Sequence, residues 1–175
     1  MREEGKLDLE PRSAPRADGQ VVTLRLFDEA RARHVVGGEP ERGANWARDY
    51  PAEGDREAAS ALLRELAQRR SPGQFGPYEV LEVDRGLVVG GIGFHAPPGR
   101  DGTVEVGYGI VAAEANKGYA TAALAAMLGL ARDLGARRVI ARALPTNLAS
   151  RRVMEKAGMT FTGLVEGFAS YAIDL

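Results

Sequence analysis

The stretch from residue 103 to residue 134 most constrains the fold, because a strand pattern passes into a long helix pattern within a few residues. The segment TVEVGYGIV alternates like a β-strand, with one face made of Val104, Val106, Tyr108 and Ile110 and the other made of Glu105, Gly107 and Gly109. From Lys117 to Leu134, apolar residues recur at helical spacing. This junction favours a mixed α/β fold.

Further strand and helix patterns flank this stretch. Strands are predicted at residues 21–26, 78–83, 87–94, 137–144, 160–165 and 170–175. Helices are predicted between Asp28 and Tyr50, from Asp55 as the capping residue to residue 70, and from residue 148 to Gly158. Asp84-Arg85-Gly86 predicts a hairpin turn, since glycine supplies the positive φ. Together these patterns predict one mixed α/β sheet with flanking helices.

Length and composition bound the class of protein. A chain of 175 residues fits one domain. The charges of its 23 basic and 24 acidic residues nearly cancel, so the protein has no strong overall electric field that would attract nucleic acid or a membrane. The absence of cysteine and the presence of only two histidines argue against disulfides and a metal site. Residues 1–20 are charged and contain proline, and they are interpreted as a flexible, cytoplasmic extension before a domain at 21–175.

The segment EANKGYATAAL predicts an anion site at the start of a helix. The first helical amides, around Lys117 to Thr121, have no intrahelical acceptor, and Gly118 and Ala120 keep side-chain bulk away from them. The Lys117 ammonium and the Thr121 hydroxyl add donors, so a pyrophosphate could approach the backbone. The alternative is that Gly118 only shapes the turn and Ala120 only favours the helix.

The N-terminus of another predicted helix follows the next predicted strand. Asn147 and Ser150 lie at its start, where both side chains could face the same ligand. The alternative is local capping, in which Asn147 accepts from the Ser150 amide. Gly90-Gly91-Ile92-Gly93 lies inside a strand pattern and is interpreted as a bulge or a close backbone approach in the sheet rather than a dinucleotide loop.

The motifs VEVGYGIV, KGYATAAL and NLASRRVMEKAGM together resemble the GNAT acyltransferase superfamily, and most of all the branch of ribosomal-protein N-terminal alanine acetyltransferases. The resemblance covers roughly residues 21–175. It implies a mixed, mostly antiparallel sheet of about seven strands with about four helices. The family pattern R/Q-x-x-G-x-G/A falls on residues 115–120, where Gly118 and Ala120 match but Ala115 and Asn116 depart from it.

The resemblance also implies a site for acetyl-CoA. The co-substrate would lie in a V-shaped opening between residues 103–111 and 137–144, beside the face of Gly107 and Gly109. The pantetheine arm would be held by the backbone of Ile110 and Val111, and the remaining contacts would come from Ala115, Asn116, Lys117, Gly118, Tyr119, Ala120, Thr121, Asn147 and Ser150.

The implied reaction is acetyl transfer to a primary amine of a small molecule or a protein N-terminus. Glu105 is the candidate base, with pairing to Arg142 as the alternative. The position where many relatives carry a proton-donating tyrosine is Met154, so Ser150 or a water is the candidate donor. Because Ala115 and Asn116 replace the usual residues, a GNAT-fold binding module with weak or no turnover is the alternative function.

The acceptor pocket is expected from the first half of the chain, which carries no motif. The candidate lining residues are Trp46, Tyr50, Asp55 and His95, with packing in the core or exposure on the surface as the alternatives. An exposed edge of such a sheet could pair with a second copy and form a homodimer.

Overall fold

The sheet runs in the order β1–β2–β4–β5–β6–β7–β9–β8, with β3 beside β5, in the computed structural model of the chain, which describes residues 12–15 and 21–175. The strands are β1 (Ser13–Pro15), β2 (Val21–Leu26), β3 (Asn45–Trp46), β4 (Pro77–Glu82), β5 (Leu87–Phe94), β6 (Thr103–Ile110), β7 (Arg138–Ala143), β8 (Thr160–Val165) and β9 (Phe168–Asp174). The helices are α1 (Glu29–Gly37), α2 (Glu53–Ala67), α3 (Tyr119–Asp133) and α4 (Leu148–Lys156). Short 3₁₀ turns lie at Gly73–Phe75 and Ala112–Glu114.

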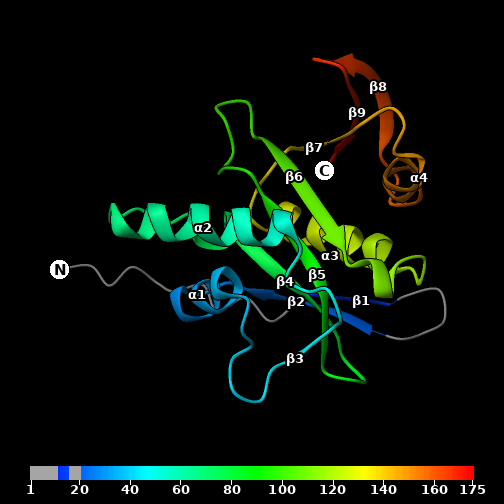
Figure 1. Ribbon diagram of the computed structural model, residues 1–175. Coiled ribbons are helices and arrows are strands. Elements are labelled where there is room, and N and C mark those ends of the chain that lie inside the picture. Colours follow the sequence, from blue (N-terminus) through cyan, green and yellow to red (C-terminus); the bar gives the residue numbers. More distant parts are fainter. Residues whose placement is uncertain (1–11, 16–20) are drawn as a thin grey trace.

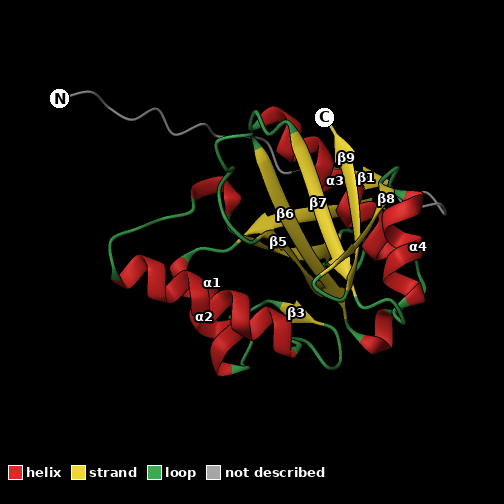
Figure 2. Ribbon diagram, turned by 90° about the horizontal axis from the view of Figure 1, so that it is seen from above, coloured by secondary structure: helices red, strands yellow, loops and turns green. Residues whose placement is uncertain are grey.

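Helices cover both faces of the sheet (Figures 1 and 2). On one face, α1 packs against α2, and α2 packs against β4 and β5. On the other face, α3 packs against β1, β2 and β4 to β6, where it meets the buried side chains of Val104 and Val106. The predicted mixed, mostly antiparallel sheet with four helices is confirmed. Among the strands of residues 12–15 and 21–175, the pairs β6–β7 and β3–β5 are the parallel ones.

The β4–β5 hairpin forms where it was predicted. Gly86 has a φ of 57°, which is the left-handed conformation that this turn requires. The buried Glu82 carboxylate accepts hydrogen bonds from the backbone N–H groups of Asp84 and Arg85, at 3.0 and 3.2 Å. The turn is therefore fixed by both its glycine and a buried acid at its base.

Strands β6 and β7 separate along their length. Thr103, Val104 and Glu105 pair with Arg138, Val139 and Ile140, and no pairing continues beyond them among the described residues. The rest of β6 thus leaves one backbone edge without a strand partner. This geometry confirms the V-shaped opening that the family resemblance implied between the two strands.

Helix α2 begins earlier than predicted. Asp55 is the third residue of the helix and not its cap, which is Ala52. The Asp55 carboxylate accepts from the backbone N–H of Ala52 at 2.9 Å, so it still satisfies an amide at the helix start. An acid suits either position, and the sequence pattern did not distinguish them.

Part of the predicted flexible extension forms a strand. Residues 13–15 pair with β2, the Arg12 carbonyl accepts from the Leu24 N–H at 2.9 Å, and the Ser13 and Thr23 hydroxyls lie 2.7 Å apart. A strand of three residues is too short to show alternation, which explains why the sequence did not reveal it. Residues 1–11 and 16–20 of that predicted extension lie outside the described residues. None of the helices in the described part of the chain has the length and apolar character needed to cross a bilayer.

Candidate active site

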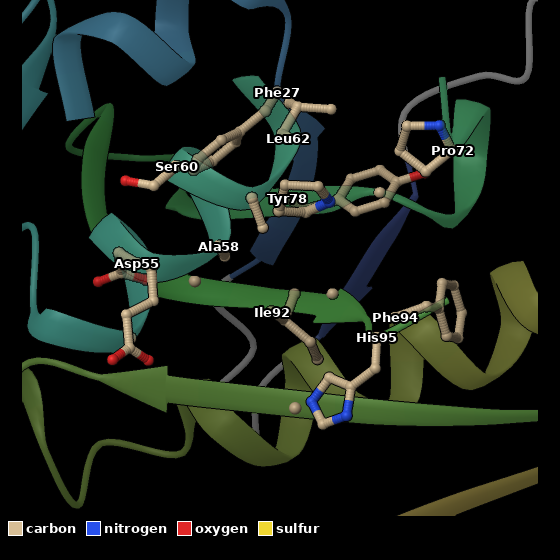
Figure 3. A pocket seen from close by; sticks show the side chains of 18 of the residues that line it. Phe27, Asp55, Ala58, Ser60, Leu62, Pro72, Tyr78, Ile92, Phe94 and His95 are labelled. Carbon is tan, nitrogen blue, oxygen red and sulfur yellow. The ribbon is translucent and has the colours of Figure 1, made fainter. Parts of the chain in front are cut away.

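Four glycines form a flat floor on the α2 side of the sheet. Gly91 lies opposite Gly109 and Gly93 lies opposite Gly107 on the neighbouring strands β5 and β6, so all four face the same way. Above this floor, a groove of about 1490 Å³ runs between the sheet and α2. Its walls also include Asp55, Tyr78, Phe94 and His95 (Figure 3). The lack of side chains on the floor leaves room for a ligand beneath α2.

His95 and Glu105 lie at one end of this floor. The two residues are joined across the strands by a hydrogen bond from the His95 N–H to the Glu105 carbonyl, at 2.9 Å. Their side chains face each other, with His95 Nδ1 3.7 Å from Glu105 Oε1, and Arg142 Nη1 lies 3.8 Å from Glu105 Oε2. The predicted pocket residue His95 thus lines the groove, and Glu105 has the arginine neighbour that was the alternative to a base.

Asp55 lies above another part of the floor, over Gly91. A Cβ atom on Gly91 would be 2.1 Å from Asp55 Oδ1, so only glycine leaves space for the carboxylate there. Burial of the carboxylate raises the pKa of Asp55 to about 6, although the hydrogen bond from Ala52 acts in the opposite direction. Asp55 is 8% exposed, and Figure 3 shows it on the groove wall.

The raised pKa makes Asp55 a pH-dependent cost to folding. The folded protein binds this proton more tightly than the unfolded chain, so stability falls as pH rises between about 4 and the folded pKa of about 6. We expect Asp55→Asn, which keeps an acceptor for the Ala52 N–H, to gain on the order of 2 kcal/mol at pH 7 and nothing at pH 3.5. Urea denaturation at both pH values measures this difference.

The matched control for this prediction is Glu57→Gln, which removes an exposed acid from the same helix. Its stability should follow that of the wild type at both pH values, because an exposed carboxylate is not desolvated by folding. An equal gain for Asp55→Asn at pH 3.5 and pH 7 would contradict the assignment.

Trp46 and Tyr50, which were predicted to bind substrate, are not among the residues that line the groove. Their rings pack edge to face at 5.0 Å, and Trp46 is paired with Val88 through β3. Burial is the main cause that raises the pKa of the Tyr50 phenol. Within residues 12–15 and 21–175, the Tyr50 hydroxyl is the buried side-chain polar atom without a hydrogen-bond partner. Both aromatic rings serve packing, which was the alternative interpretation.

The backbone of Ile110 faces the opening between β6 and β7. Hydrogen bonds at Glu105 and Val111 show that odd-numbered residues of this stretch turn their backbone groups toward β5. Even-numbered residues, including Ile110, therefore turn theirs toward the opening. Val111 differs, because its N–H donates to the Val89 carbonyl at 3.0 Å and its carbonyl accepts from Glu114 at 3.0 Å. Of the two predicted pantetheine contacts, Ile110 has the required orientation and Val111 does not.

The loop before α3 presents its amides as predicted. Asn116 and Gly118 have φ values of 61° and 84°, and the first helical hydrogen bond joins the Ala122 N–H to the Gly118 carbonyl at 3.1 Å. The amides of the first turn, through Ala120 and Thr121, therefore have no acceptor on the helix itself. Ala115 and Asn116 are exposed at the edge of this helix mouth.

Lys117 and Tyr119 belong to a polar network beneath this loop. Lys117 Nζ lies 2.9 Å from Glu114 Oε2, and Arg85 Nη2 lies 2.9 Å from the same carboxylate oxygen. Arg85 also binds Glu82 through Nε at 2.7 Å and the Tyr119 hydroxyl through Nη2 at 2.7 Å. The hydrogen bond from Arg85 is the main cause that lowers the pKa of Glu114. The Lys117 charge is thus already compensated, and the Tyr119 side chain is buried with its hydroxyl bound to Arg85.

Asn147 and Ser150 lie at the start of α4, and Tyr108 reaches them from β6. Asn147 Oδ1 accepts from the Ser150 N–H at 3.0 Å, so the capping alternative is confirmed. The Tyr108 hydroxyl donates to the Ser150 carbonyl at 3.0 Å and lies 2.9 Å from Ser150 Oγ. Met154 is fully buried and offers no hydroxyl. The sequence pattern placed Tyr108 on the core face and so missed that it brings a hydroxyl to α4.

Comparisons with known proteins agree with this geometry. The family model described as acetyltransferase (GNAT) domain matches residues 22–160. A GNAT-family acetyltransferase from Bacillus anthracis has 23% identity and a TM-score of 0.64, over 94% of this chain and 98% of that one. RimJ from Mycobacterium smegmatis, in complex with CoA-disulfide, has 22% identity and a TM-score of 0.66, over 95% and 90%.

A ribosomal-protein-S5-alanine acetyltransferase from Vibrio fischeri is also similar, with 16% identity and a TM-score of 0.60, over 87% of this chain and 92% of that one. At these identities the likenesses concern the fold. Comparison with curated protein sequences gave no match. Because the family model covers most of the chain, as the three sequence motifs predicted, the chain belongs to the GNAT acetyltransferase family.

Proposed function

We propose that this protein transfers the acetyl group of acetyl-CoA directly to a primary amine. One observation carries the proposal: strand β6 borders two spaces. Its free backbone edge faces the opening between β6 and β7, and its face with Gly107 and Gly109 forms part of the floor of the groove. A thioester held in the opening and an amine held in the groove would meet at this strand. Direct transfer needs such a meeting point more than it needs any special nucleophile.

The donor side of the site accounts for acetyl-CoA as co-substrate. The amides from Asn116 to Thr121 suit its diphosphate, and the free backbone edge at Ile110 suits its pantetheine amides. Asn147 and Ser150 would contact the arm from the α4 side. The departure at Ala115 removes a side-chain donor but leaves the amides of the loop in place.

The acceptor side is the groove beneath α2. Its size accommodates either a small amine or the N-terminus of a peptide, and its lining combines aromatic walls with the carboxylate of Asp55. Similar folds include a spermidine N-acetyltransferase chimera from Vibrio cholerae and human SSAT, and the ribosomal-protein acetyltransferase noted above. We favour a primary amine of either kind, with the aromatic walls binding the apolar part of the acceptor.

Proton transfers complete the reaction. The attacking nitrogen must lose a proton, and Glu105 lies where the opening closes, beside the floor of the groove. The departing CoA thiolate must gain a proton, and the hydroxyls of Ser150 and Tyr108 lie together on the α4 side of the opening. Ser150 thus remains the proposed donor, with Tyr108 as its hydrogen-bonded neighbour.

The test combines acetyl-CoA calorimetry with a CoA-release assay across alkylamines, spermidine and peptides that begin with alanine or serine. We expect binding by the wild type and amine-dependent CoA release. Binding without release for every amine would support the regulatory-module alternative, and no binding at millimolar acetyl-CoA would overturn both functions.

The variant Asn147→Ala tests the acetyl-CoA side of the site, and Asp28→Ala, which removes the N-cap of another helix, is its control. Asp28 caps α1 as Asn147 caps α4, so Asp28→Ala and Asn147→Ala should each cost about 1 kcal/mol of stability. Only Asn147→Ala should also weaken acetyl-CoA binding, by roughly tenfold, which corresponds to about 1.4 kcal/mol. Equal affinities for the two variants would remove Asn147 from the site.

A further inference from the structure

The groove contains a titratable side chain that the transfer has not yet used. His95 lies at the end of β5, and its side chain is 61% exposed. A Cβ atom on Gly107 would be 2.7 Å from His95 Nε2, so the ring lies directly over the glycine floor. Figure 3 shows the imidazole beside the strands, at a distance from Asp55.

The two ring nitrogens of His95 have different surroundings. Nδ1 faces the carboxylate of Glu105 at 3.7 Å, whereas Nε2 lies over Gly107, a residue that lines the groove. A carboxylate beside Nδ1 favours the tautomer with its proton on that nitrogen, which leaves the Nε2 lone pair toward the groove. The separation exceeds a hydrogen bond, but such contacts often shorten when substrate binds.

Glu105 is less well placed to take a proton itself. Its Oε1 is directed at His95 and its Oε2 lies 3.8 Å from Arg142, which in turn lies 3.9 Å from Glu166. Each carboxylate oxygen therefore faces another side chain, that of His95 or that of Arg142. Of the two side chains at this end of the floor, His95 is the one whose ring nitrogen lies over Gly107.

We infer that His95 is the catalytic base of the transfer and that Glu105 is a positioning residue that orients its ring. This inference rests on the proposed function. The ammonium group of the acceptor first passes one proton to His95 Nε2. The neutral nitrogen then forms a bond to the acetyl carbon, and the carbon–sulfur bond breaks with its electron pair on sulfur. The Ser150 hydroxyl gives a proton to the thiolate and regains one from the newly acylated nitrogen, and the imidazolium returns its proton to water.

The test uses the full-length protein as wild type, His95→Gln, Glu105→Gln and the double variant. With the most active alkylamine of the panel at pH 7, His95→Gln should lower kcat by about 100-fold or more while acetyl-CoA affinity stays unchanged. Glu105→Gln should lower kcat by about tenfold, and the double variant should match His95→Gln, because Glu105 acts only through the ring.

A second readout separates a base from a structural role. The deficit of His95→Gln should shrink as pH rises toward about 10.4, where an alkylamine loses its proton without help. Added imidazole should restore part of the activity at pH 7. Because His95 is exposed, its replacement should leave the melting temperature unchanged, which shows that the variant is folded.

The outcomes distinguish this inference from the function on which it rests. A wild type that releases no CoA with any amine overturns the proposed function and the inference with it. An active wild type in which Glu105→Gln loses more activity than His95→Gln overturns the inference alone, because Glu105 would then be the base. A His95→Gln deficit that stays constant with pH also overturns it.

Discussion

Gly90→Ala is expected to lower the free energy of unfolding by about 3 kcal/mol or more. The added Cβ would be 2.1 Å from the Gly109 carbonyl oxygen and 2.9 Å from the Ile110 Cα. Both atoms belong to the backbone of β6, so no side chain can move away to relieve the overlap. Strands β5 and β6 would have to separate at the point where Ile110 borders the opening, and acetyl-CoA binding should weaken as well.

Thermal and urea denaturation measure this loss. For a domain of this size, about 3 kcal/mol corresponds to a decrease of roughly 6–12 °C in melting temperature. Gly129→Ala is the matched control, because it adds the same methyl group within α3 and meets no atom within 4 Å. That control should gain about 0.5–1 kcal/mol from the change to alanine in a helix. A melting temperature of Gly90→Ala equal to the wild type would disprove the close approach.

Gly107→Ala is expected to remove most of the activity and little of the stability. Its Cβ would be 2.7 Å from His95 Nε2, and since the imidazole is an exposed side chain, it can swing away while the strands remain paired. The displaced ring would no longer lie over the floor. We expect kcat to fall by about 100-fold, as for loss of the base itself, with a melting temperature near that of the wild type.

The variant Gly109→Ala is the control for Gly107→Ala. It shows whether the loss of activity comes from displacement of His95 or from any methyl group added to the floor of the groove. It places a methyl group on the same face of the same strand, two residues away, and meets no atom within 4 Å. Its kcat should fall much less than that of Gly107→Ala. Equal losses in steady-state assays of the two variants would mean that the floor is sensitive to any added volume and that the His95 contact is not special.

Local patterns predicted most of the fold because they depend on neighbouring residues. The Asp84-Arg85-Gly86 turn and the passage from β6 to α3 follow from alternation, helical spacing and glycine φ values, all of which are local. The start of α2 was wrong by a few residues, since Asp55 satisfies a helix amide as well from inside the first turn as from the cap. The strand at 13–15 has too few residues to show a pattern.

The site was less predictable, because its contacts join distant parts of the chain. Arg85 lies in a hairpin turn, yet it binds Glu114 and Tyr119 in the loop that precedes α3. Tyr108 follows the core-facing alternation of β6, yet its hydroxyl reaches Ser150. The direction of each backbone edge also depends on the strand partner, and for this reason Ile110 and Val111 could not be told apart from the sequence.

The polar network beneath the loop before α3 determines how diphosphate binding at that loop would depend on ionic strength. The cations of Arg85 and Lys117 are matched by the carboxylates of Glu82 and Glu114, so the charges close to the loop cancel. A diphosphate held there would be bound by oriented amide dipoles at contact distance and not by a long-range field of charge. Dissolved ions screen the long-range field far more than contacts at this distance. The affinity of this loop for a diphosphate should therefore stay nearly constant as ionic strength changes.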